Sequence, residues 1–271
     1  FNYRHIFNGW WRMDSKIMPK FLKDINLKGK VALITGATKG IGRSTAIAMH
    51  QVGASIVAIG RNKNELNSLK KKLKTRIQCI ECDVNDYDKI SNVINKLKKI
   101  DILVNNAGTN LPEPFLKVKK SSLETLLEVN TKSAFNVAKL CTDKMLKHKM
   151  RKKIGASIIH TSSMFGLVAG PNRTVYSMTK FGIEGLTKGM AVDLAKFNIR
   201  VNSVCPTFVA TPRAKKYLAN KEFNKYALSN IPLGRIATES DVATAITFLS
   251  SNAASMITGT NIIIDGGWTA K

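Results

Sequence analysis

Seven short apolar runs, most of them separated by segments with helical spacing, constrain the fold of this chain more than any other feature. The runs are Val31–Thr35, Ser55–Ile59, Ile77–Cys82, Ile102–Asn105, Ser157–Thr161, Arg200–Cys205 and Asn261–Ile264. Strands that alternate with helices form a parallel sheet covered on both faces, because each connection must cross over the sheet. The sequence therefore predicts an α/β fold with a doubly wound parallel sheet.

The size and composition favour one soluble domain. No Pro/Gly/Ser-rich linker interrupts the 271 residues, so residues 27–271 are expected to form a single domain. Hydrophobic residues make up 44% of the chain, yet no apolar stretch approaches the roughly 20 residues that cross a bilayer. The free cysteines fit a reducing compartment. We therefore expect a cytoplasmic protein with no membrane partner.

A glycine-rich turn follows the first run and indicates a nucleotide site. The glycines of Thr35-Gly36-Ala37-Thr38-Lys39-Gly40-Ile41-Gly42 have the spacing G-x-x-x-G-x-G, and an amphipathic segment begins at Arg43. Backbone amides in such a turn can approach a pyrophosphate, and the helix dipole favours its negative charge. The turn alone is also typical of other nucleotide-binding and structural turns.

A tyrosine and a lysine, Tyr176 and Lys180, are spaced to lie on one helical face. A lysine cation beside the phenol favours phenolate and would lower the tyrosine pKa toward working pH. Together with the glycine turn, Asn105-Asn106-Ala107-Gly108, Asn130 and Ser163, this pair resembles the short-chain dehydrogenase/reductase family. The resemblance runs from about Leu27 to Trp268 and implies a Rossmann fold, with seven strands as the expected number.

The resemblance also implies catalytic roles. Carbonyl reduction needs a hydride, which a nicotinamide cofactor supplies, and a proton, which the protein must supply. Tyr176 would be the acid, Ser163 would hold the substrate oxygen, and Lys180 would bond the nicotinamide ribose. Asn130 matches the asparagine that fixes a helix kink and a proton-relay water.

Cofactor choice is expected to depend on the end of the second run. An NAD enzyme commonly places an acidic residue there, whereas this chain has Gly60-Arg61-Asn62. Arg61 and Lys39 can pair with a 2′-phosphate, which implies NADP(H). The residues expected to bind the cofactor are Gly36, Thr38, Lys39, Gly40, Ile41, Gly42, Arg61, Asp83, Val84, Asn106, Ala107, Gly108, Tyr176, Lys180, Pro206, Val209 and Thr211.

Several of these assignments keep an alternative. Asp83 resembles the family's adenine contact but could instead cap the next helix. The asparagines of Asn105-Asn106 could mainly brace the sheet. Thr207 stands where the family usually has glycine, which leaves the geometry of that loop open.

The leading function is an NADP(H)-dependent oxidoreductase that interconverts a ketone and a secondary alcohol on a small substrate. Residues 207–235 would form a mobile lid, and Arg173, Arg213, Lys215 and Lys216 could hold a substrate carboxylate. Alternatives are a 3-oxoacyl-[acyl-carrier-protein] reductase, whose acidic carrier could dock on the basic surface, and a Rossmann regulatory protein that only binds cofactor. The family implies a homotetramer packed through the helices around Ser122–Met145 and Tyr176–Phe197.

Other features are interpreted as structural. The net charge of +25 could attract nucleic acid, but the lysines are spread along the chain, which favours compositional drift over a specific nucleic-acid partner. The densest basic cluster, Lys144–Lys153, is expected at the end of the sheet away from the cofactor. Cys79 and Cys82 fall in a strand-like run without further ligands, and His5, His50, His148 and His160 have no ligand spacing, so no metal is expected.

Residues 1–26 precede the family-like region and are treated as an extension. Met13 and Met18 could be natural starts, in which case the first dozen residues are an artefact of gene prediction. A transit peptide and an oligomer-contacting arm are the other origins considered.

Overall fold

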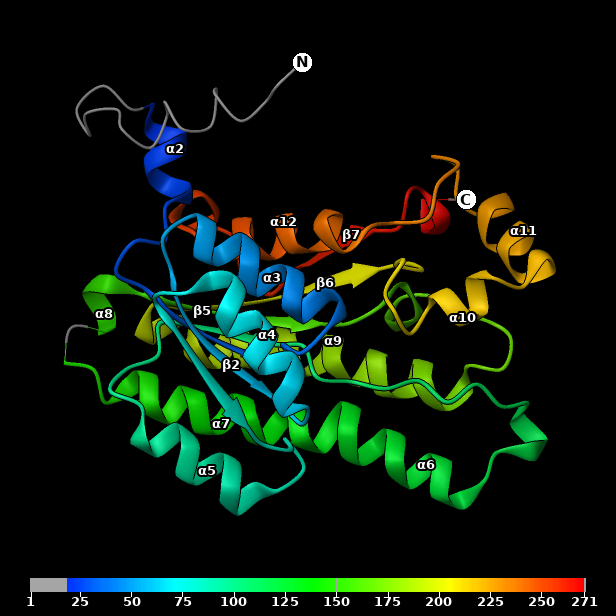
Figure 1. Cartoon of the computed structure of the whole chain (residues 1–271), viewed down its shortest axis with the longest axis horizontal. Helices are drawn as coiled ribbons and strands as arrows, with labels where there is room; N and C mark the ends of the chain where they lie inside the picture. Colours follow the sequence, from blue (N-terminus) through cyan, green and yellow to red (C-terminus); the bar gives the residue numbers. More distant parts are fainter. Residues whose placement is uncertain (1–18, 150, 271) are drawn as a thin grey trace.

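Seven parallel strands form one sheet in the order β3-β2-β1-β4-β5-β6-β7. The computed structural model describes residues 19–149 and 151–270 of the chain (Figure 1). The strands are β1 Val31–Thr35, β2 Ser55–Gly60, β3 Ile77–Glu81, β4 Ile102–Asn105, β5 Ala156–Thr161, β6 Ile199–Pro206 and β7 Asn261–Ile264. The strand order reverses between β1 and β4, which places a crevice at the carboxyl ends of these strands. The predicted doubly wound fold is confirmed, and each predicted strand is present to within one residue at either end.

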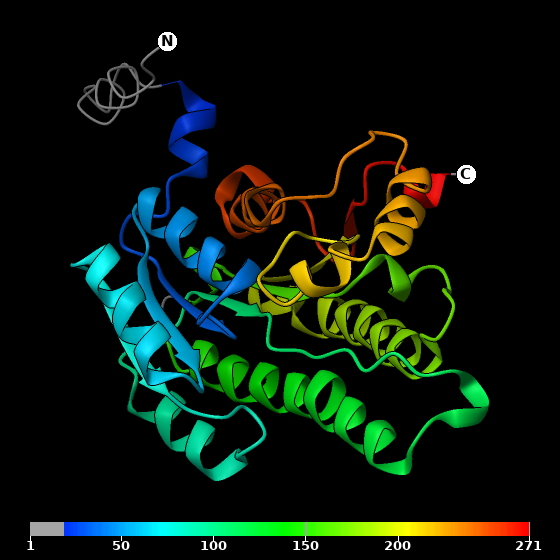
Figure 2. The same ribbon diagram turned by 45° about the vertical axis from the view of Figure 1, so that its right-hand side comes forward.

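Helices cover both faces of the sheet (Figures 1 and 2). The longer ones are α3 Gly40–Gln51, α4 Lys63–Leu73, α5 Tyr87–Lys96, α6 Lys120–Leu127, α7 Ser133–Leu146, α9 Thr174–Leu194, α11 Lys221–Ser229 and α12 Glu239–Ser250. The shorter ones are α2 Lys20–Ile25, α8 Arg151–Ile154 and α10 Lys215–Leu218. A π-helical turn, η2 Glu128–Lys132, joins α6 to α7, and short 3₁₀ turns include η1 Phe115–Lys117, η3 Met164–Gly166 and η6 Trp268–Ala270.

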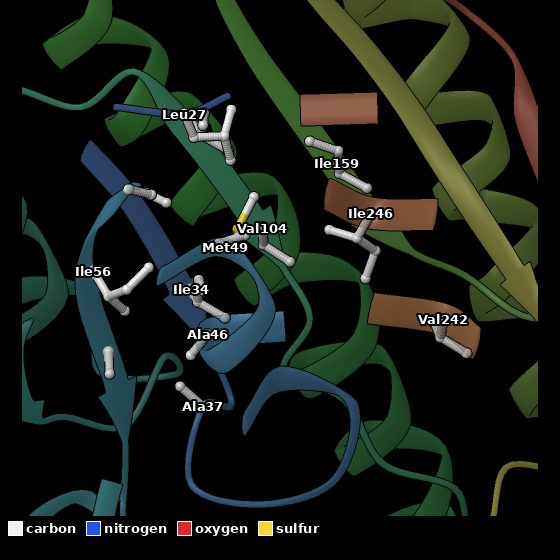
Figure 3. Close-up of a cluster of buried hydrophobic side chains, with 14 of the residues drawn as sticks. Leu27, Ile34, Ala37, Ala46, Met49, Ile56, Val104, Ile159, Val242 and Ile246 are labelled. Carbon is white, nitrogen blue, oxygen red and sulfur yellow. The ribbon is translucent and has the colours of Figure 1, made fainter. Parts of the chain in front are cut away.

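Alternate residues of the strands feed two apolar layers. Ile34 of β1 packs in one layer with Met49 of α3 and Ile246 of α12 (Figure 3). Its neighbour Leu33 points to the other layer, with side chains of α5 and α7. Since successive strand residues face opposite sides, a strand covered on both faces is apolar throughout. This explains why the strands are continuous apolar runs in the sequence.

The amino-terminal segment is described only from residue 19. Residues 1–18 of the expected extension lie outside the described residues, while α2 precedes Leu27, which is buried in the core. Among the described residues, no helix is both long and apolar enough to cross a membrane.

The basic cluster lies at the end of the sheet opposite to α10 and α11, as predicted (Figure 1). Its Arg151 is 3% exposed, and its guanidinium lies 3.4 Å from Asp101 and donates to the Ile100 carbonyl at 2.9 Å. This arginine therefore holds the start of α8 against the residues that precede β4. The four cysteines are free, and Cys79 and Cys82 lie on and just after β3, as the structural interpretation requires.

Candidate active site

A cleft of about 880 Å³ opens at the carboxyl ends of the strands. It is lined by the segments that follow β1 to β6. Of the residues expected to bind cofactor or to act in catalysis, all line this cleft except Gly42 and Asn130. These two lie behind the surface of the cleft, where they shape the backbone.

The glycine turn between β1 and α3 leaves no space for side chains. Gly36 has a φ of +66°, and a Cβ there would lie 3.0 Å from the Asn106 amide nitrogen. A Cβ on Gly42 would overlap the Gly36 carbonyl oxygen. The helix begins at Gly40 rather than at Arg43, so its free amides face the turn. Lys39 precedes it and is exposed.

The asparagines at the end of β4 brace the sheet. The Asn106 side chain donates to the Thr35 carbonyl at 3.0 Å, and the Asn105 side chain donates to the Ala134 carbonyl at 2.7 Å. The Thr35 hydroxyl in turn accepts from the Asn106 and Ala107 amides at 2.9 and 3.0 Å. These bonds fix β4 against β1 and α7, so both asparagine side chains brace the sheet.

Arg61 and Asp83 meet at the far end of the cleft. Their charged atoms lie 3.6 Å apart, and the Arg61 side chain is 71% exposed. Asp83 also accepts from the Asn85 amide at 3.0 Å. The alternative in which Asp83 caps the next helix is wrong, because Asp86 caps α5 through the Lys89 amide.

Asn130 lies in the π-helical turn η2, where the sequence predicted a kink. It is buried, its oxygen accepts from the Thr109 amide at 2.8 Å, and its nitrogen donates to the Thr109 carbonyl at 2.9 Å. The same nitrogen donates to the Thr179 hydroxyl of α9 at 3.1 Å. The extra residue of a π turn lets this side chain reach both the β4 loop and α9.

Ser163, Tyr176 and Lys180 come together on the floor of the cleft. Ser163 follows β5, and its hydroxyl lies close enough to Tyr176 to act on the pKa of that phenol. The Lys180 ammonium lies 5.7 Å from the centroid of the Tyr176 ring and donates to the Thr161 carbonyl at 2.8 Å. Helical spacing on α9 and the turn after β5 therefore bring a phenol, a hydroxyl and a cation together.

The expected effect of Lys180 on Tyr176 is corrected by the structure. Burial raises the pKa of Tyr176, and the neighbouring Ser163, Arg173 and Arg213 offset this only in part. Burial lowers the pKa of Lys180 to about 8. Desolvation opposes the charged form of both groups, so the phenol is neutral near pH 7.

The loop after β6 adopts an ordinary backbone conformation. The φ angle of Thr207 is not positive, so threonine fits at this position, where the family usually has glycine. The Thr207 amide donates to the Ile264 carbonyl at 3.1 Å. Pro206, Val209 and Thr211 line the cleft from this loop. The Thr211 hydroxyl accepts from the Ala214 amide at 3.2 Å.

Four basic residues were expected to be able to bind a substrate carboxylate, and only some of them line the cleft in the structure. Arg173 and Arg213 line the cleft, whereas Lys215 does not, because α10 turns it outward; the side chain of Lys216 lies outside the described residues. Sequence reasoning missed the aromatic wall of Phe208, Tyr217 and Phe223. The high density of aromatic residues in 207–235, the region predicted as a lid, could have indicated that these rings face the cleft.

Comparisons with known proteins agree with this geometry. A family model described as "Enoyl-(Acyl carrier protein) reductase" matches residues 36–269. The chain is 38% identical to the 3-oxoacyl-[acyl-carrier-protein] reductase FabG of Thermotoga maritima, over 90% of this chain and 99% of the relative. It is 36% identical to the L-xylulose reductase of Mus musculus, over 91% and 99%.

A solved structure extends the comparison. The gluconate 5-dehydrogenase from Burkholderia cenocepacia J2315, in complex with NADP and tartrate, superposes with a TM-score of 0.87 at 28% identity, over 92% of this chain and 99% of that one. The matches span nearly the whole domain, and the glycine turn and the Tyr176–Lys180 pair are in place. The chain therefore belongs to the short-chain dehydrogenase/reductase family of oxidoreductases.

Proposed function

We propose that this protein is an NADP(H)-dependent oxidoreductase that interconverts a ketone and a secondary alcohol on a small substrate. The observation that carries the proposal is that Ser163, a neutral Tyr176 and Lys180 line the cleft together, with the Lys180 ammonium 5.7 Å from the centre of the Tyr176 ring. A neutral phenol in that position can donate a proton to a carbonyl oxygen.

The residues of the cleft fit the cofactor. Gly36 and Gly40 line the cleft at the start of α3, where a pyrophosphate could approach the helix amides, and the two cations Lys39 and Arg61 line the side where a 2′-phosphate would lie. No carboxylate directly follows β2, and the nearby carboxylate of Asp83 is paired with Arg61. When bound, NADPH supplies the hydride that goes to the carbonyl carbon.

The protein then supplies the proton and the orientation. Ser163 holds the carbonyl oxygen, and the Tyr176 hydroxyl gives its proton to that oxygen as the carbon receives the hydride, which yields the alcohol. Lys180 stabilises the phenolate left behind, and Asn130 positions α9 through Thr179. Oxidation of the alcohol is the reverse sequence. The names of the relatives refer to acyl, sugar and sugar-acid substrates. They support a reaction between a carbonyl and an alcohol, and they do not indicate which of these substrates this protein uses.

We predict that Tyr176→Phe lowers kcat by about 10²–10⁴-fold, the usual range for loss of a general acid. NADPH affinity should stay within about twofold, because the ring and its edge contact with Phe165 remain. Steady-state kinetics and cofactor titration measure the two quantities. The control is Tyr87→Phe on the surface of α5, which should act like wild type. Near wild-type turnover by Tyr176→Phe would exclude this tyrosine as the acid.

We also propose a homotetramer packed through α7 and α9. Phe135, Phe181 and Val192 are exposed on these helices, and burial of exposed apolar side chains favours association. The molar mass in solution, measured by light scattering, tests this assembly.

A further inference from the structure

The described residues that line the cleft around Tyr176 carry positive charge and no carboxylate, although buried Glu184 acts on Lys180 from behind the lining. Arg173, Lys180 and Arg213 line the cleft there. Among the described lining residues the one acid is Asp83, which pairs with Arg61 at the end of β3, four strand positions from β5. Both arginines are close enough to Tyr176 to lower its pKa. An anionic group is therefore favoured next to the proton donor.

Arg173 presents an unsatisfied donor to this region. It immediately precedes α9, and its NH1 group donates to the Asn172 carbonyl at 3.2 Å. Its Nε is buried and has no hydrogen-bond partner among the described residues. Burial lowers the pKa of the Arg173 guanidinium, with Tyr176, Tyr217 and Tyr226 opposing the shift. The edge formed by Nε and NH2 is the one that binds a carboxylate through two parallel hydrogen bonds.

Arg213 reaches the same region from the loop that follows β6. Its guanidinium donates to the Gly108 carbonyl at 3.4 Å and to the Thr109 hydroxyl at 3.3 Å. These long contacts place the cation after β4, while Arg173 lies at the start of α9. The two arginines thus come from segments 40 residues apart and flank one tyrosine.

Three further polar atoms of the cleft lack partners. The oxygens Asn110 Oδ1, Thr161 Oγ1 and Thr207 Oγ1 are buried and unbonded within the described part of the chain, and their residues line the cleft. Buried polar atoms are normally hydrogen-bonded. Groups of this kind match hydroxyls on a ligand.

We infer that the substrate is a short polyhydroxy acid or its keto form, with Arg173 binding the carboxylate, Arg213 adding a second cation, and the unpartnered oxygens receiving hydroxyls. The inference rests on the proposed function and specifies its substrate class. The rings of Phe208 and Phe223, whose centroids lie 5.1 Å apart, add an apolar surface to the lining of the cleft.

The test compares substrates that differ only at the carboxylate. The full chain is assayed with NADP⁺ on gluconate against glucitol and on tartrate against threitol. We expect the acid of at least one pair to have a kcat/KM at least tenfold above its polyol. Arg173→Gln should lower kcat/KM for that acid by about 10–100-fold, the range for a charge-assisted hydrogen bond, and leave the polyol within about threefold. Arg173→Lys should recover only part of the loss, since it keeps the charge without the planar edge.

Lys215→Gln is the matched control, because it removes one cation from the neighbouring α10 outside the cleft. It should leave both members of each pair unchanged. Equal kcat/KM for acid and polyol in wild type, or an equal loss for both in Arg173→Gln, would overturn the inference.

A binding readout separates this inference from the proposed function. With NADP⁺ saturating, the acid at a fixed concentration should raise the melting temperature of wild type more than its polyol does, and Arg173→Gln should abolish the difference. No such difference in wild type would reject the carboxylate subsite. A failure of the proposed function would give a different result. The protein would show no NADP(H)-linked turnover on any ketone or alcohol, while the acid would still raise its melting temperature.

Discussion

At the residue scale, cofactor choice is expected to depend on Arg61. Its contact with Asp83 is exposed and therefore contributes little, so the guanidinium is available to a phosphate. We predict that wild type prefers NADPH and that Arg61→Ala lowers kcat/KM for NADPH by about 10–100-fold, because a charge-assisted contact contributes about 1.5–3 kcal/mol. NADH should be affected little. Kinetics with both cofactors measure this, with the exposed α4 variant Lys70→Ala as control. Equal or better use of NADH by wild type contradicts the assignment.

At the element scale, α10 and α11 form the outer wall of the cleft, and we propose that they act as the lid expected for residues 207–235. Two edge-to-face aromatic pairs hold α11 in place. The ring centroids of Phe223 and Phe208 lie 5.1 Å apart, and those of Tyr226 and Trp268 lie 5.7 Å apart. Each such pair contributes about 0.5–1.5 kcal/mol. We predict that Phe223→Ala raises the substrate KM by about 3–10-fold with a smaller change in kcat, and that the amides of α11 exchange faster with solvent. Phe115→Ala, at an exposed turn outside the cleft, is the control. Unchanged exchange in α11 would show that these rings do not hold it.

At the scale of the whole molecule, the net charge and its placement bear on the carrier-protein alternative. The cluster Lys144–Lys153 faces the end of the sheet away from the cleft, so its charge cannot orient an acidic carrier at the entrance. We predict that small keto acids and free ketones are used with kcat/KM at least equal to that of 3-oxoacyl chains on a carrier protein. Measurement at low and moderate salt checks this, since docking by charge weakens on screening. A carrier-bound substrate preferred by orders of magnitude, with a steep loss on adding salt, would favour the alternative.

Much of the fold could be predicted because its signals are local. A strand buried on both faces must be apolar throughout, so β1 to β7 were visible as runs with ends correct to one residue. A turn that leaves no room for Cβ atoms must be glycine, so Gly36 and Gly42 marked the first crossover. A four-residue spacing on one helix places Tyr176 and Lys180 on one face whatever surrounds them.

Other properties of the site could not be read from the sequence, because they depend on segments far apart in the chain. The sequence showed that Arg173 and Arg213 were candidates, but only the packing of α9 against the loops after β4 and β6 brings both to Tyr176 and turns Lys215 away. The pairing of Asp83 with Arg61, rather than with a helix end, follows from the adjacency of β2 and β3.

The direction of the pKa shift of Tyr176 also shows which properties depend on the sequence alone and which depend on the tertiary structure. By itself the sequence determined that a cation lies near the phenol, which predicts a lowered value. Only the tertiary structure decided how much solvent is removed from both groups, and this desolvation raises the pKa of Tyr176 and lowers that of Lys180. The sequence therefore determined which groups are present and how they are spaced along each element. The structure decided their protonation and their partners. Solvation and charge act through space, so they depend on which elements are neighbours in the fold, and the local sequence does not show this.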